Sequence, residues 1–266
     1  MIPDFAKDVL LSALKKGGET LMNYLGSNTE ATVKESISSV VTEADLASEK
    51  AILEVLRDAT DSWNIVTEES GYRNTGSNYT WVVDPLDGTS NFAAGLPWFG
   101  VIIALFEQEV PVLGGMYLPV DEQLYLTEKG GGATRNGEVI SVTSSTVLSQ
   151  NLLSYSFDFS EDQDKTRSEM EIMAKLSREV RNIRSTNSLV DFCYVADGRL
   201  GAALNQNTKI WDIGVPWLMI REGGGKVTDI KGKEIKFDLS ARAVLQNYTI
   251  LASGAALHSP ILKTIS

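Results

Sequence analysis

Residues 81–92, WVVDPLDGTSNF, carry the most informative pattern in the sequence. An apolar strand over 81–83 leads into Asp84, and Pro85 then fixes a rigid turn, because its ring restricts φ and it has no N–H to donate. Asp87 follows three residues after Asp84. The two carboxylates can therefore converge on one side of the turn.

The residues after this turn suit an anion. Gly88 permits a close backbone approach, and the polar run 89–91 can begin a helix, whose free N–H groups and dipole favour a bound anion. Ligands for a cation would then lie beside a cradle for phosphate. An ordinary strand–turn–helix unit, in which Asp87 only caps the helix, explains the same pattern, so this segment alone leaves both interpretations open.

Three further acidic positions have ordinary explanations when taken singly. Glu68–Glu69 follow a short apolar strand and read as solvated surface acids. Asp212 stands at a predicted helix start, where Asp is a common N-cap. Asp45 lies three residues after Thr42, which is capping-box spacing with Asp in place of the usual Glu or Gln.

Taken together, four of these acids fall at strand ends or helix starts, the positions where sites assemble in layered α/β folds. They are Glu68, Asp84, Asp87 and Asp212. Four such carboxylates in one place would repel one another unless divalent ions lay between them. Carboxylate oxygens suit hard cations such as magnesium.

The composition limits the alternatives. A chain of 266 residues, 43% of them hydrophobic, can form one large core or two abutting lobes. We expect a single unit over 1–266 with two lobes and a soft boundary near 145–185. The net charge of −11 repels nucleic-acid backbones and anionic membranes at long range, so we expect neither as a partner. The longest apolar run, 98–106, is too short to span a bilayer.

The rare residue types exclude other chemistries. Cys193 is the only cysteine and His258 the only histidine, which argues against a zinc site of the usual His/Cys kind. We expect His258 to be a surface or packing residue. No internal disulfide can form, and the N-terminus has no signal-peptide pattern, so we expect a cytoplasmic protein.

Hydrophobic periodicity predicts an α/β chain (or α+β) that alternates helices and strands. A glycine-rich turn is expected over 129–136, and Gly223-Gly224-Gly225 reads as a helix stop. The expected helices are 3–25, 43–57, 162–179, 189–195 and 212–221. The expected strands are 64–66, 81–83, 101–106, 112–117, 123–127, 201–204, 226–228 and 248–252.

These motifs resemble the inositol monophosphatase family, part of the lithium-sensitive, magnesium-dependent sugar phosphatase superfamily. The resemblance rests on DPLDGTSNF over 84–92, EES over 68–70, and the Trp-Asp pair 211–212 followed by EGGG over 222–225. It spans most of the chain, to about Asp229. It implies a layered αβαβα fold, commonly dimeric. It also implies a phosphomonoesterase that acts on a small polyol or sugar phosphate, such as inositol monophosphate, with two to three Mg²⁺ ions.

The resemblance also implies metal ligands. Glu68, Asp84 and the Leu86 carbonyl would hold one Mg²⁺. Asp84, Asp87 and Asp212 would hold a second, and a third, weaker ion would lie near Glu68.

The remaining implied roles concern substrate and water. The start of the helix at Gly88, Thr89 and Ser90 would bind the phosphate through backbone N–H groups, with Asp212 on the substrate side. Glu68 and Thr89 would orient the attacking water, and Asp45 would support Thr89.

The sequence departs from the family where the alcohol would bind. The acid expected seven residues before the Trp-Asp aspartate is Asn205. A small Gly-Ser/Thr-Ala stretch appears as Thr186-Asn187-Ser188, and two small residues after Asp212 appear as Ile213-Gly214. The metal ligands are complete but the alcohol-binding wall is altered, so the departure concerns which alcohol is bound and not the phosphatase activity.

Several alternatives remain open. Within the superfamily they are an adenosine 3′,5′-bisphosphate nucleotidase, a fructose-1,6-bisphosphatase and a histidinol-phosphate phosphatase. A calcium-binding module built on Asp84 and Asp87 does not match the twelve-residue EF-hand loop. A non-catalytic divalent-cation-binding module of the same fold would be expected to lack some ligands.

Overall fold

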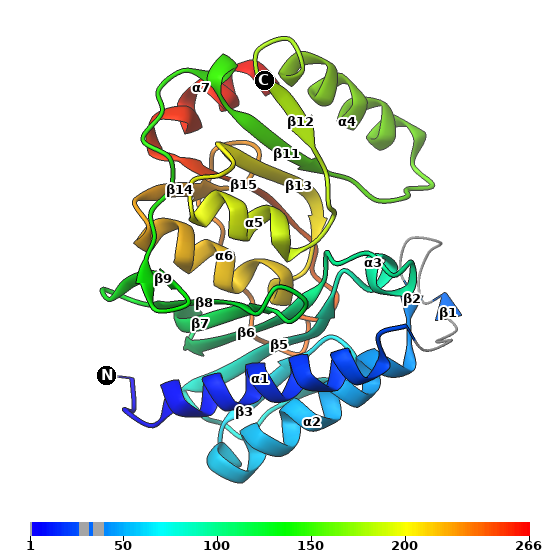
Figure 1. The fold of residues 1–266 in the computed structure, drawn as a ribbon, viewed down its shortest axis with the longest axis vertical. Coiled ribbons are helices and arrows are strands. Elements are labelled where there is room, and N and C mark those ends of the chain that lie inside the picture. Colours follow the sequence, from blue (N-terminus) through cyan, green and yellow to red (C-terminus); the bar gives the residue numbers. More distant parts are fainter. Residues whose placement is uncertain (1, 27–31, 34–39) are drawn as a thin grey trace.

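The computed structural model describes residues 2–26, 32–33 and 40–266, and its helices and sheets form five layers (Figure 1). From one side to the other these are a helix pair, an eight-stranded sheet, a second helix pair, a five-stranded sheet and a third helix pair. The predicted layered αβαβα architecture is therefore confirmed.

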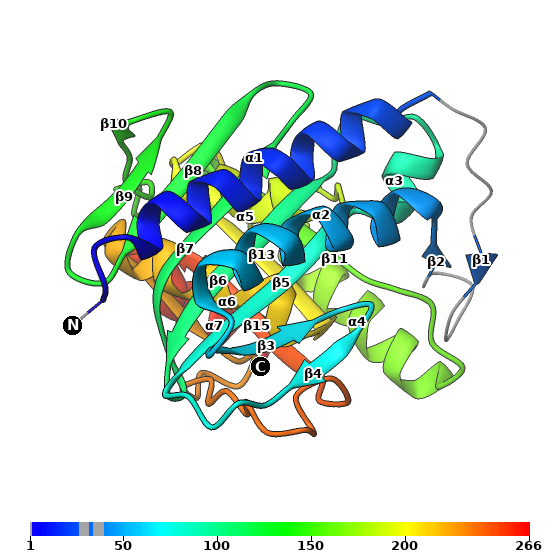
Figure 2. The ribbon, with the colours of Figure 1, turned by 90° about the horizontal axis from the view of Figure 1, so that it is seen from below.

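The first layer consists of α1 (Ala6–Tyr24) and α2 (Glu43–Thr60), which run side by side across the first sheet (Figure 2). The strand order in that sheet is β10-β9-β8-β7-β6-β5-β3-β4, antiparallel except for the parallel pair β3–β5. Its strands are β3 (Asn64–Thr67), β4 (Gly71–Arg73), β5 (Tyr79–Asp87), β6 (Gly100–Glu107), β7 (Val110–Leu118), β8 (Gln123–Glu128), β9 (Gly132–Arg135) and β10 (Glu138–Val139).

The middle helices α5 (Leu189–Ala196) and α6 (Ile210–Glu222) contact both sheets. The second sheet has the order β12-β11-β13-β15-β14 and is covered on its outer side by α4 (Gln163–Leu176) and α7 (Ala255–Ile265). Its strands are β11 (Leu152–Ser156), β12 (Asn182–Arg184), β13 (Ala202–Thr208), β14 (Gly225–Thr228) and β15 (Tyr248–Gly254). The short elements are β1 (Thr32–Val33), β2 (Val40–Val41), α3 (Thr89–Ala93) and the 3-10 turn Leu148–Gln150.

Both faces of the first sheet are buried, which follows from the apolar strands read in the sequence. Because successive side chains of a strand point to opposite faces, Trp81 and Val83 pack with α1 and α2, whereas Val82 packs with the middle helices. The two sheets use separate stretches of chain, 64–139 and 152–254. The division into two lobes with a soft boundary near 145–185 stays a prediction.

Most predicted elements are present, but several boundaries were wrong. The turn expected over 129–136 contains β9, which pairs with β8. Strand β5 does not end at Asp84 but continues, with irregular pairing to β6, as far as Asp87. Helix α6 begins two residues before Asp212. The sequence reading missed β4, β11, β12 and α7.

His258 is a packing residue and not a surface residue. It is 4% exposed, and its ring lies between the hydroxyls of Ser253 and Thr228. Among the described residues, no helix is both long enough and apolar enough to cross a membrane.

Candidate active site

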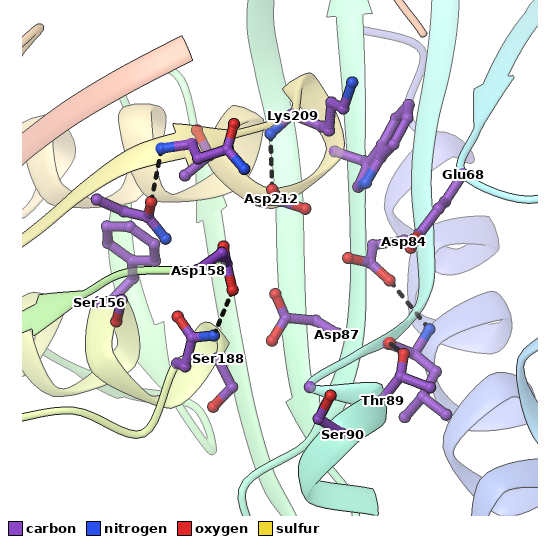
Figure 3. A pocket seen from close by; sticks show the side chains of 18 of the residues that line it. Glu68, Asp84, Asp87, Thr89, Ser90, Ser156, Asp158, Ser188, Lys209 and Asp212 are labelled. Carbon is purple, nitrogen blue, oxygen red and sulfur yellow. Dashed lines mark hydrogen bonds between the residues drawn. The ribbon is translucent and has the colours of Figure 1, made fainter. Parts of the chain in front are cut away.

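A cavity of about 510 Å³ opens between the two sheets and receives side chains from both halves of the chain (Figure 3). Its acidic side is formed by Glu68, which follows β3, and by the end of β5 with the start of α3. The opposite side is formed by β13, the start of α6 and the loops before α4 and α5. All the predicted site residues line this cavity except Asp45, which lies behind Thr89.

Three aspartates meet in this cavity. One carboxylate oxygen from each of Asp84, Asp87 and Asp212 lies within 4.8 Å of the other two. Asp212 is 125 residues from Asp87 in sequence, so the fold creates the group. Glu68 lies in the same cavity beside Asp84 (Figure 3). The predicted convergence of Asp84 and Asp87 is thus present, and Asp212 joins them.

The irregular end of β5 presents these acids. The register of β5 against β6 shifts between Asp84 and Asp87, and Pro85 lies at the break because it cannot donate to the ladder. The Leu86 N–H donates to the Asp84 carboxylate at 3.0 Å. The Ser48 hydroxyl of α2 donates to the Pro85 carbonyl at 2.8 Å. Backbone and helix together fix the turn.

Gly88 is required by the geometry of this turn. It caps α3 with φ 86°, in the left-handed region that glycine adopts without strain. A Cβ atom there would lie 2.5 Å from the Trp98 carbonyl oxygen. The sequence prediction that a helix starts at Thr89 is confirmed.

Thr89 is held by a residue outside the cavity. Its hydroxyl lies 2.9 Å from the Asp45 carboxylate and 3.0 Å from the Leu86 carbonyl, so it donates to one of these acceptors. Asp45 is fully buried and also accepts the Thr42 N–H at 2.7 Å, completing the predicted capping box. The Thr89 hydroxyl proton is therefore engaged by one of these two acceptors, and its lone pairs remain for other donors.

The other two aspartates are fixed by backbone groups of the middle helices. The Leu189 N–H, at the start of α5, donates to Asp87 at 2.5 Å. The Lys209 N–H donates to Asp212 at 2.7 Å. Asp212 is the third residue of α6 and not its N-cap, so it closes a capping box from inside the helix.

The electrostatics of this group oppose full ionisation. Burial raises the pKa of Asp84 well above its usual value, and the charges of Glu68, Asp87 and Asp212 raise it further. Burial and the charge of Asp212 likewise raise the pKa of Asp87. The pKa of Asp212 is raised to about 6, with burial as the largest cause. A divalent cation at this point would relieve the repulsion.

Sequence reasoning missed one supporting acid, Glu49. It is 3% exposed, and its carboxylate accepts the N–H groups of Glu69 at 3.0 Å and Ser70 at 3.3 Å, together with the hydroxyls of Thr67 and Ser70. It therefore fixes the loop that carries Glu68. The available signal was its position four residues after Asp45, on the same face of one helix.

The far wall of the cavity contains the residues that depart from the family pattern. Asn205 is half-buried on β13, and its side-chain oxygen accepts the Asn207 N–H at 2.8 Å, so its NH₂ group is the part offered to the cavity. Lys209 adds a cation, with Nζ 3.3 Å from the Val244 carbonyl oxygen. Ser90 lies exposed at the rim.

A further carboxylate, Asp191, fixes the loop before α5. It accepts the Thr186 N–H at 3.2 Å and the Ser156 hydroxyl at 3.0 Å, and burial raises its pKa. The residues Thr186-Asn187-Ser188 are thereby tied to β11.

The donor set fits magnesium. Three buried or half-buried carboxylates that repel one another, a fourth beside them and the Leu86 backbone carbonyl are all hard oxygen ligands. The backbone at the start of α3 lies next to them, so a phosphate held there would lie against any bound cation.

Several known proteins are similar to this chain in sequence and fold. It is 33% identical over 261 residues to an inositol-1-monophosphatase of Caulobacter vibrioides, covering 96% of this chain and 99% of that one. It is 32% identical over 262 residues to a fructose-1,6-bisphosphatase/inositol-1-monophosphatase of Aquifex aeolicus, covering 96% and 93%. The crystal structure of the extragenic suppressor protein suhB from Bartonella henselae matches with a TM-score of 0.89 and 29% identity, covering 98% of each chain.

The model of the inositol monophosphatase family matches residues 5–266, nearly the whole chain and every residue of the cavity. Members of this family depend on magnesium, which agrees with the donor set. The chain belongs to the inositol monophosphatase family and is a phosphatase, a phosphoric monoester hydrolase.

Proposed function

We propose that this protein is a magnesium-dependent phosphomonoesterase that hydrolyses a small polyol or sugar phosphate, such as inositol monophosphate. The observation that carries the proposal is the meeting of Asp84, Asp87 and Asp212 within 4.8 Å, beside the backbone that starts α3. An acidic protein needs local positive charge to bind a phosphate, and these carboxylates are suited to hold it.

In this proposal two to three Mg²⁺ ions bind to Glu68, Asp84, Asp87, Asp212 and the Leu86 carbonyl. When bound, magnesium supplies positive charge that polarises the ester and makes a water a better nucleophile. Every other contribution comes from the chain itself.

The chain binds and orients the reactants. The backbone N–H groups of Gly88, Thr89 and Ser90 face the phosphate oxygens at the start of α3, where the helix dipole favours an anion. Because the Thr89 hydroxyl donates to Asp45 or to the Leu86 carbonyl, its oxygen is free to accept a hydrogen bond from the attacking water. Glu68 accepts a second hydrogen bond from that water. Asp45 acts through Thr89 and is a positioning residue.

Phosphate release with and without Mg²⁺ tests the proposal. Asp84→Asn should nearly abolish turnover. Asp45→Asn should lose less activity, because Asp45 acts only through Thr89. Equal, small losses in the two variants would contradict these roles. No release from any polyol or sugar phosphate in the presence of Mg²⁺ would contradict the function.

A bisphosphorylated sugar is the second candidate, and the cavity wall favours it. Asn205 offers its NH₂ group and Lys209 its ammonium, and both are donors that suit an anionic group. The relative named fructose-1,6-bisphosphatase/inositol-1-monophosphatase supports the same candidate. Asn205→Asp replaces the donor with an acceptor, so it should shift the ratio of kcat/KM values toward inositol monophosphate. An unchanged ratio would contradict this specificity role.

We further propose that the enzyme is inhibited by lithium, forms a homodimer and is located in the cytoplasm. Inhibition of phosphate release by LiCl and sedimentation equilibrium check the first two.

A further inference from the structure

A second hollow of about 630 Å³ adjoins the cavity and contains two exposed aromatic rings. Phe157 and Phe159 line it and are 43% and 47% exposed. Both lie in the segment between β11 and α4. Two phenylalanine side chains that are this exposed therefore line the same hollow. The catalytic arrangement proposed above gives neither of them a role.

The two hollows are adjacent and share part of their lining. Asp158 and Asn187 line both of them, and the Asn187 NH₂ donates to Asp158 at 2.9 Å (Figure 3). A molecule whose phosphate lies at the start of α3 can therefore extend past Asp158 toward the second hollow.

We propose that this second hollow is a subsite for a flat, uncharged aromatic ring on the alcohol part of the substrate, such as the base of a nucleoside. The proposal rests on the proposed phosphatase function and narrows its substrate class. Phenylalanine rings bind such bases by stacking, which tolerates any base because every base has a π-face. The volume is in the range of small-molecule sites.

The charges around the hollow favour a neutral ring over a second phosphate. Asp158 is an acceptor and repels an anion, whereas it can accept the N–H groups of a base. The lining cation, Arg167, is already paired with Asp164 at 3.0 Å. Gln163 supplies an amide that both donates and accepts, as the edge of a base requires.

The main comparison uses two substrates that carry the phosphate on the same carbon and differ in the ring. Phosphate release in Mg²⁺ is measured from adenosine 5′-monophosphate and from ribose 5-phosphate, with the 2′- and 3′-monophosphates of adenosine as further substrates. We expect wild type to prefer adenosine 5′-monophosphate to ribose 5-phosphate, and the other two isomers show which phosphate position suits the subsite. The double variant Phe157→Ala/Phe159→Ala should lose about tenfold in kcat/KM on adenosine 5′-monophosphate. Its kcat/KM on ribose 5-phosphate should be unchanged.

Matched variants separate stacking from bulk. Phe157→Leu/Phe159→Leu keeps apolar volume without rings and should lose the preference too, whereas Phe157→Tyr/Phe159→Tyr should retain it. Phe5→Ala, at a phenylalanine that is 48% exposed and packs on Trp63, is the control away from the hollow.

A binding measurement keeps this inference distinct from the phosphatase proposal. Saturation-transfer NMR of adenosine in EDTA should give a signal with wild type that the double alanine variant reduces severalfold. If no ester is hydrolysed in Mg²⁺ but this signal is present, the phosphatase proposal fails and the ring subsite stands.

Three results would overturn the subsite. The first is a wild type that binds no adenosine and prefers ribose 5-phosphate. The second is an equal loss on both substrates in the double variant. The third is a change in sedimentation with an unchanged substrate ratio, because the rings would then belong to a contact between proteins.

Discussion

Replacing Glu49 with glutamine tests whether a buried acid outside the cavity controls the loop that carries Glu68. The carboxylate accepts two backbone N–H groups and two hydroxyls from residues 67–70. Glutamine preserves the shape. Its oxygen can replace the one that accepts three of these donors, and its NH₂ can donate to the Ser70 hydroxyl once that group turns.

The magnitude follows from the change in charge. A hydrogen bond to an ionised acceptor contributes roughly 1.5–3 kcal/mol, against roughly 0.5–1.5 kcal/mol for a neutral one. Three bonds share one oxygen and weaken one another, so we expect Glu49→Gln to lower the free energy of unfolding by about 2 kcal/mol. Glu49→Ala leaves all four donors unpaired and should lose more.

Urea unfolding followed by circular dichroism, in EDTA at neutral pH, measures this change. Glu54→Gln is the matched control because Glu54 lies exposed on the same helix, and surface substitutions usually stay within about 0.5 kcal/mol. In phosphate-release assays Glu49→Gln should also need more Mg²⁺ for half-maximal rate, since the Glu68 loop loses its anchor. If the two variants unfold alike and need the same Mg²⁺ concentration, the positioning role of Glu49 is refuted.

Three other perturbations have definite expected outcomes. Magnesium at about 100 times its dissociation constant should stabilise the fold by roughly 2.7 kcal/mol, so equal melting temperatures in Mg²⁺ and EDTA would contradict the metal site. Gly88→Ala should destabilise the fold by roughly 1–3 kcal/mol and reduce phosphate release at least severalfold, whereas Gly95→Ala has a similar φ of 73° with open space around it and should spare the activity. Burial lowers the pKa of His258 to about 4, below the 6.5 of the unfolded chain. As the pH falls, the unfolded state therefore binds the proton first. The free energy of unfolding should decrease by up to about 3 kcal/mol between pH 6.5 and pH 4. Acid unfolding of His258→Gln should lack that component, and a variant as acid-sensitive as wild type would argue against it.

Hydrogen-bond partners explain why His258 resists protonation. The Thr228 hydroxyl donates to the Asp229 carbonyl at 2.7 Å, so it accepts from His258 Nε2. His258 Nδ1 is then the acceptor for the Ser253 hydroxyl at 2.8 Å. A second proton on the ring would force that hydroxyl to turn away.

The sequence was most informative where local chemistry restricts the backbone. Pro85 restricts φ, and a turn that leads from a strand into a helix needs a residue such as Gly88 that accepts a positive φ. The turn and the helix start could therefore be predicted from 81–92 alone, although the end of the strand could not. The turn over 129–136 was wrong for the opposite reason. Its glycines allow many conformations, and pairing with β8 selects a strand for Gly132–Arg135. Helix α7 was missed because Pro260 lies inside it and removes one helical hydrogen bond.

Contacts between distant segments could not be read from spacing. No local pattern places Asp212 beside Asp84. Their common position at strand ends and helix starts suggested that they meet, and the resemblance to a family added to that expectation. The hydrogen bond from the Leu189 N–H to Asp87 joins the two halves of the chain. It could not be predicted from the sequence, because every residue except proline has a backbone N–H.

Helix α2 explains how an outer layer can set the geometry of an inner cavity. No residue of α2, all of which the structure describes, lines the cavity. Asp45, Ser48 and Glu49 nevertheless lie at i, i+3 and i+4 on one face of the helix, and each holds a different part of the acidic wall. Asp45 holds Thr89, Ser48 holds the Pro85 carbonyl, and Glu49 holds the loop after Glu68. Buried carboxylates that repel one another would otherwise separate when no cation is bound. Because one rigid helix fixes both acidic segments, the aspartates stay buried and close together, and burial and their mutual repulsion raise the pKa values of Asp84 and Asp87.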